Sequence, residues 1–133
     1  MHVLDSSAFI HEYHTSEQMA SVPAVAEELD GESAYRFDAM EGAGMHIHIP
    51  ADNTVETIER AAVETGDGEE LSDTDVRLIA AAFELDGTLV TDDYAMQNVA
   101  EHLGVVVEAI ARDGITEQRD WRFQCQGCGR EFD

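Results

Sequence analysis

The sequence contains no lysine: its seven basic residues are all arginine, against 29 aspartate and glutamate residues. It has only two cysteines, so a framework of disulfides cannot organise the fold. No apolar run approaches the roughly 18 residues that a membrane-spanning helix needs. The N-terminal stretch MHVLDSSAFI lacks the basic start and the long apolar segment of a secretory signal. We therefore expect a cytoplasmic protein that does not contact a membrane.

The shortage of basic residues leaves a formal net charge of −22. A basic partner would explain this charge, and so would a concentrated salt solution, in which charges are screened beyond about 3 Å. The acids are spread along the whole chain rather than gathered in a tail, which favours a halophilic source. In that setting an acidic surface does not exclude a nucleic-acid ligand.

The 133 residues, 44% of them hydrophobic, suffice for one folded domain with a core. Buried or alternating patterns predict strands at 2–5, 44–51, 88–91 and 105–110. Capped amphipathic patterns predict helices at 6–14, 21–29, 52–66, 71–87 and 92–104. Because strands and helices alternate, we expect an α/β fold in three layers with a central parallel sheet. This domain covers 1–111, and the polar segment 112–120 is predicted to be a linker.

Acidic residues recur where the predicted strands end or where the neighbouring helices begin and end. In an open parallel sheet, ligands bind beyond the carboxyl ends of the strands. Converging carboxylates bind hard cations such as Mg²⁺ or Mn²⁺, which can activate a water molecule and stabilise a phosphoryl transition state. The sequence therefore predicts a metal cluster formed from Asp5, Glu28, Asp75, Asp92 and Asp93.

Each of these acids also has a structural alternative. Ser72-x-x-Asp75 has the pattern of a capping box, and Asp92 or Asp93 could cap the helix that follows it. A phosphatase alternative is less well supported. ELDGTLVTDD resembles the aspartyl-phosphate phosphatase loop, but Glu84 stands in the position of the nucleophilic aspartate and the preceding residues are predicted to be helical.

Four segments in this order, VLDSSAFI, VPAVAEEL, LSDTDVRLIAAA and LVTDDYAMQNVA, resemble those of a PIN-domain nuclease. The last segment, followed by WRFQCQGCGREF, is similar to the Nin-one-binding family, which finishes the 3′ end of small-subunit ribosomal RNA. The resemblance implies a PIN-like fold and divalent-metal-dependent hydrolysis of one phosphodiester. It implies metal-binding acids at Asp5, Glu28, Asp75 and Asp93, with Asp92 as an open alternative to Asp93. It also implies precursor ribosomal RNA within the pre-small subunit as substrate, and a KH-type RNA-binding partner.

Other residues are weaker candidates for RNA contact. Ser6 and Asn98 could orient the phosphate, and the tail arginines could touch the RNA backbone, although solvation explains all of them equally well. The tail arginines are Arg112, Arg119, Arg122 and Arg130. We expect Tyr94 and Met96 to pack rather than to bind bases. His46 and His48 share one face of a strand, which is more typical of a solvated face than of a metal site.

Cys125-x-x-Cys128 resembles the first knuckle of a zinc ribbon, so residues 121–133 are predicted to be half of a Zn²⁺ site. A complete ribbon needs a second pair of ligands, and we therefore expect the chain to be part of a longer protein. This Cys-x-x-Cys motif also distinguishes a ribosomal-RNA nuclease from a toxin-type PIN ribonuclease, because the toxin-type enzymes, which cut transfer or messenger RNA, typically lack it. A third possibility is a non-catalytic module that binds RNA or an assembly factor.

Overall fold

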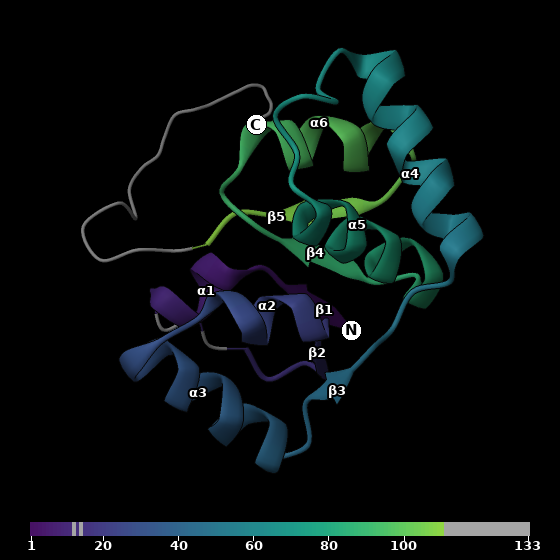
Figure 1. Cartoon of the computed structure of the whole chain (residues 1–133). Coiled ribbons are helices and arrows are strands. Elements are labelled where there is room, and N and C mark those ends of the chain that lie inside the picture. The colour runs from purple at the N-terminus through teal and green to yellow at the C-terminus, as the bar shows by residue number, and fades with distance from the viewer. Residues whose placement is uncertain (12, 14, 111–133) are drawn as a thin grey trace, which may run out of the picture.

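A computed structural model describes residues 1–110 except 12 and 14; the predicted linker and zinc half-site lie outside the described residues. The chain forms five strands and six helices over this range, with the helices between or beside the strands (Figure 1). The strands are β1 (His2–Leu4), β2 (Met19–Ser21), β3 (His46–Ile47), β4 (Thr88–Val90) and β5 (Val106–Glu108). The helices are α1 (Ser6–Ile10), α2 (Pro23–Glu28), α3 (Gly31–Gly42), α4 (Asp52–Thr65), α5 (Asp73–Leu85) and α6 (Tyr94–His102).

All strand pairs are parallel, and the sheet has the order β3-β2-β1-β4-β5. The chain fills one side of β1 with β2 and β3 before it crosses to β4 and β5 on the other side. The boundary between β1 and β4 is therefore the switch point, where parallel sheets of this kind leave a crevice for ligands. Leu4 is in register with Val90, so the residues that follow the two strands leave the sheet side by side.

The predicted α/β architecture is confirmed, and the helices divide into two groups. Figure 1 shows α4, α5 and α6 around β4 and β5, and α1, α2 and α3 around β1, β2 and β3. The largest fully buried side chains hold the layers together; they include Phe9, Leu4, Ile58, Leu78, Ile79, Leu89 and Met96. Each such side chain contributes about 1.5–3 kcal/mol through burial of apolar surface.

Three local expectations differ from the structure. The sequence does not predict β2 or α3, both of which are present. The predicted helix 6–14 ends at Ile10, because the amide of Tyr13 turns back to the Ala8 carbonyl at 2.8 Å and carries the tyrosine ring into the core. The predicted strand 44–51 shortens to His46–Ile47.

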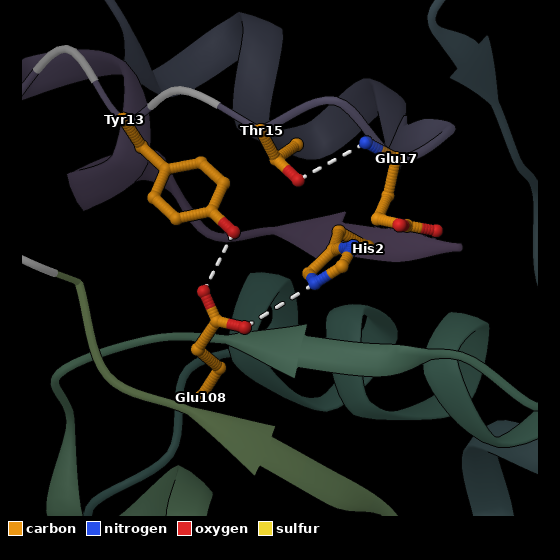
Figure 2. A network of polar contacts seen from close by, with 5 residues as sticks. All are labelled: His2, Tyr13, Thr15, Glu17 and Glu108. Carbon is orange, nitrogen blue, oxygen red and sulfur yellow. Dashed lines mark hydrogen bonds and ion pairs between the residues drawn. The ribbon is translucent and has the colours of Figure 1, made fainter.

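A polar network fixes the segment after α1 against the last strand. The Tyr13 hydroxyl donates to Glu108 Oε2 at 2.7 Å, and His2 Nε2 contacts Glu108 Oε1 at 3.2 Å (Figure 2). Glu108 belongs to β5 at one sheet edge, whereas His2 lies on the central strand β1. The network thereby joins β5 to two segments near the N-terminus of the chain. In the described part of the chain, no helix has the length and apolar character needed to cross a membrane.

Candidate active site

Asp5 directly follows β1 and is held by four donors. Its Oδ1 accepts hydrogen bonds from the backbone amide of Ser6 at 2.6 Å and from the Ser6 hydroxyl at 3.2 Å. Its Oδ2 accepts from the hydroxyls of Ser7 at 3.2 Å and Thr91 at 2.7 Å. Asp5 is 8% exposed and Thr91 is fully buried. Charge-assisted hydrogen bonds of this kind fix the orientation of the carboxylate beyond the carboxyl end of β1.

The two acids that follow β4, Asp92 and Asp93, have different hydrogen-bond partners. Asp93 caps α6, and its Oδ1 accepts from the amides of Ala95 at 2.8 Å and Met96 at 3.2 Å. Its own amide donates to the Thr91 hydroxyl at 3.1 Å, so one buried threonine connects Asp93 to Asp5. Asp92 instead accepts at Oδ1 from the Ile110 amide at 3.0 Å, beyond the end of β5.

Asp75 approaches the same place from the first turn of α5. The capping box predicted for Ser72 and Asp75 is present, with one bond of 3.1 Å and its reciprocal of 3.0 Å. Burial raises the pKa of the Asp75 carboxyl, and the charges of Asp5 and Asp93 raise it further, while the bonds from Ser72 oppose the shift. The smaller contributions of Asp5 and Asp93 to this shift indicate that both carboxylates lie within electrostatic reach of Asp75.

Glu28 is the last residue of α2 and reaches the start of α5. Its Oε2 accepts from the Thr74 hydroxyl at 2.7 Å, next in sequence to Asp75. On the other side Glu28 borders a cavity of about 420 Å³, whose lining includes Ile10, Ser33 and Arg36. Arg36 Nη1 donates to the Phe9 carbonyl at 2.9 Å, which fixes its guanidinium against the end of α1.

These acids have the chemistry of a site for a hard divalent cation. Carboxylate oxygens are the ligands that Mg²⁺ and Mn²⁺ prefer. Burial is the main cause of the raised pKa of Asp75, and a cation placed among the acids would relieve the repulsion that Asp5 and Asp93 add to it. Between residues 1 and 110, as far as they are described, no group of three or more His, Cys, Asp or Glu side chains could hold an ion as it stands. The chemistry of the acids suits such a cation, but their arrangement in this structure is not a closed metal site.

The remaining candidates have separate positions. The Ser6 hydroxyl is used by Asp5, and Asn98 is exposed on α6. Met96 is buried as expected, but Tyr94 is 81% exposed, because it is the first residue of α6 and projects beyond the cap. The tail residues Arg112, Arg119, Arg122, Arg130, Cys125 and Cys128 lie outside the described residues.

Sequence reasoning did not identify the neutral groups that hold the acids. Ser7, Thr74 and Thr91 donate to Asp5 or Glu28, and Arg36 borders the cavity beside Glu28. The Ser-Ser pair after Asp5 and the Thr-x-Asp spacing before Asp93 are the local signals that could have revealed two of them. Thr74 and Arg36 carry no such signal, because their roles depend on how α5 and α3 pack.

Comparison with known proteins gives a consistent result. A model described as the PIN domain of ribonuclease matches residues 2–85. An endoribonuclease Nob1 from Archaeoglobus fulgidus is 37% identical over 139 residues, covering 100% of this chain and 82% of its own length. The Nob1 of Pyrococcus abyssi is 36% identical over 132 residues, covering 98% and 80%. A ribonuclease VapC1 from Thermoplasma acidophilum is 30% identical over 135 residues, covering 99% and 69%.

Proposed function

This chain belongs to the PIN-domain ribonucleases and to the family of the Nob1 endoribonucleases, and from that premise we propose that it cleaves precursor small-subunit ribosomal RNA at its 3′ end. The observation that carries the proposal is the convergence of Asp5, Asp75 and Asp93 where β1 and β4 leave the sheet. An activity on pre-ribosomal particles would place the protein in the cytoplasm, in agreement with the expectation from the sequence.

The proposed chemistry divides the work among the described residues. Asp5, Glu28, Asp75 and Asp93 would hold Mg²⁺ or Mn²⁺; when bound, such an ion activates a water molecule and neutralises charge on the phosphate. Thr91 keeps Asp5 oriented, and Asp93 is fixed by the amides that it caps. The exposed ring of Tyr94, beside Asp93, is positioned to stack on a base of the RNA.

We also propose a division of the chain into regions and roles for the remaining candidate residues. We assign residues 1–111 to the nuclease domain, 112–120 to a linker and 121–133 to the first part of a zinc ribbon. Cys125 and Cys128 would bind Zn²⁺, and the tail arginines Arg119, Arg122 and Arg130 would contact the RNA backbone. Ser6 and Asn98 are secondary candidates for phosphate contact, and a KH-type RNA-binding factor is the proposed partner.

Asp5→Asn tests the assignment, because it keeps the shape of the side chain and removes the charge. We expect cleavage to fall by on the order of 100-fold or more, the scale of losing one group that stabilises transition-state charge. The assay uses an end-labelled RNA spanning the 3′ end of the small-subunit precursor, with saturating Mn²⁺. Asp52→Asn is the matched control, because Asp52 is an exposed acid at the start of α4 and should leave the rate unchanged.

The same assay separates the competing functions. Cleavage of the precursor at one position supports the proposal. Cleavage of transfer or messenger RNA alone would favour a toxin-type ribonuclease, for which the similarity to VapC1 is the relevant observation. Binding of RNA without cleavage by the wild-type chain would favour a non-catalytic module. Wild-type rates in Asp5→Asn would contradict the assigned site.

A further inference from the structure

Two histidines at an edge of the sheet form a cluster separate from the acids. His46 belongs to the edge strand β3, and His48 lies two residues further along the chain. The sequence predicts a solvated face for these histidines. In the structure they also contact each other, because His46 Nε2 lies 3.3 Å from His48 Nδ1. The imidazole of His46 is open to solvent, whereas that of His48 is half-buried.

A carboxylate contacts the second histidine, His48, through its other ring nitrogen. Glu84, near the end of α5, lies 2.7 Å from His48 Nε2 through its Oε1. Its Oε2 accepts from the Ala51 amide at 2.9 Å, so both oxygens have partners. A carboxylate at Nε2 selects the tautomer in which Nε2 carries the proton. The lone pair of His48 Nδ1 then points toward His46.

The spacing of the two nitrogens is that of two ligands of one ion. Nitrogens bound at about 2.0–2.1 Å to a tetrahedral zinc ion lie roughly 3.3–3.4 Å apart. The observed 3.3 Å agrees with this value, and without an ion the same two nitrogens form a long hydrogen bond. Metal-binding histidines commonly donate their other ring N–H to a carboxylate, which is the role Glu84 is placed to fill.

We propose that His46 Nε2 and His48 Nδ1 chelate a divalent transition-metal ion of the Zn²⁺ class, with Glu84 as the positioning residue. Imidazole nitrogen suits zinc, nickel and copper, whereas Mg²⁺ takes oxygen ligands. Among the described residues no group of three acidic, histidine or cysteine side chains could hold an ion, so the proposed site has two protein ligands there, and water would complete the shell.

This site is distinct from the proposed nuclease centre. Asp75 is in the first turn of α5 and Glu84 near its end, nine positions apart in one helix. At 1.5 Å per residue the two positions are separated by roughly 14 Å along the helix axis. An ion on the histidines would join β3 to the connection before α4. It would stabilise the folded chain insofar as it binds more tightly there, because Glu84 fixes His48 in the folded chain, whereas an unfolded chain with two histidines two positions apart binds metal more weakly.

Long-range nitrogen–proton NMR of the ¹⁵N-histidine-labelled chain tests the proposal. The full chain carries Cys125→Ser and Cys128→Ser, which remove competing thiolates, and saturating Mg²⁺ to occupy the acids. On addition of one equivalent of ZnCl₂, we expect the signals of His46 Nε2 and His48 Nδ1 to shift together. The signals of His2 and His102 should not move. Equal shifts in all of these rings, or no shift with excess zinc, would overturn the proposal.

Single variants test each role by zinc titration, with melting temperatures in EDTA as a check of folding. His46→Gln and His48→Gln should each weaken zinc binding at least 10-fold. Glu84→Gln should weaken it by about 10–100-fold, the usual effect of losing a carboxylate behind a metal-binding histidine. His102→Gln is the matched control, because His102 contacts Glu64 at 3.1 Å without a second histidine. Unchanged zinc affinity in His46→Gln would show that the chelate does not form.

Discussion

The two adjacent aspartates after β4 make different contacts although they are one peptide unit apart. Burial raises the pKa of Asp75, the charges of Asp5 and Asp93 raise it further, and Asp93 is coupled to Asp5 through the Thr91 hydroxyl. Asp92 accepts from the Ile110 amide, and so connects the exit of β4 to the segment that follows β5. The sequence left both acids open as the metal ligand, and these contacts favour Asp93.

We predict that Asp93→Asn abolishes cleavage while Asp92→Asn retains most of it. Asparagine caps helices as well as aspartate does, so Asp93→Asn keeps α6 and removes only the charge. In Asp92→Asn the amide oxygen can still accept from Ile110, so the fold should persist. Cleavage rates under saturating Mn²⁺ decide between the two acids as metal ligand. The comparison requires that both variants have the melting temperature of the wild type. Loss of cleavage in Asp92→Asn alone would reverse the assignment.

Asp5 and Asp93 were accessible to sequence reasoning because parallel strands bring their carboxyl ends to one edge, so an acid after each strand can be placed without coordinates. Asp75 and Glu28 were accessible as acids at the start and the end of predicted helices. Their supports were not accessible. Thr74 meets Glu28 across 46 positions of sequence, and Thr91 meets Asp5 across 86. Nothing in the pattern of a neutral hydroxyl distinguishes such a contact from ordinary solvation.

Among the helices and strands, those with a strong apolar period were predicted and those without one were missed. Helix α4 extends from Asp52 to Thr65, close to the predicted 52–66. Its C-terminal cap is Gly66, which has a positive φ of 83°. Helix α3 begins and ends with glycine and buries only Phe37, so it has no repeating apolar face to detect. Strand β2 has three residues and becomes recognisable only through its pairing with β1.

The loop after α1 owes its position to the Tyr13–Glu108 hydrogen bond shown in Figure 2. Burial raises the pKa of Tyr13 to about 12, and the hydrogen bond and charge of Glu108 add to the shift. Because the folded pKa lies above the ordinary tyrosine value of 10.0, the neutral phenol stabilises the folded chain. This contribution is complete below about pH 10 and is lost as the pH rises toward about 12.

We therefore predict that Glu108→Gln lowers the pKa of Tyr13, since the mutation removes the negative charge that disfavours the phenolate. Absorbance at 295 nm follows the titration, and Tyr13→Phe identifies the contribution of this ring. Between about pH 10 and 12 the free energy of unfolding should fall more steeply in the wild type than in Tyr13→Phe. Identical titrations of wild type and Glu108→Gln would contradict the electrostatic account.

Taken as one body, the chain combines an acidic candidate site with an acidic surface. Acids occur on every helix except α1, as on the exposed positions of α3 and α4, while few basic residues offset them. Such a surface repels itself unless the solution screens it, and it also repels RNA at low ionic strength. The proposed nuclease therefore depends on solution conditions in two ways, for its folded state and for its substrate.

The last prediction concerns that dependence on salt. Transfer from about 1 M KCl to about 0.1 M increases the screening length from roughly 3 Å to roughly 10 Å, so repulsion within the net charge of −22 reaches across neighbouring elements. We expect the melting temperature to fall on this transfer and to recover when KCl is restored. Sucrose at matched osmolality is the control, because it stabilises without screening charge. A melting temperature that is constant across the range would favour the other explanation of the acid excess, a basic partner.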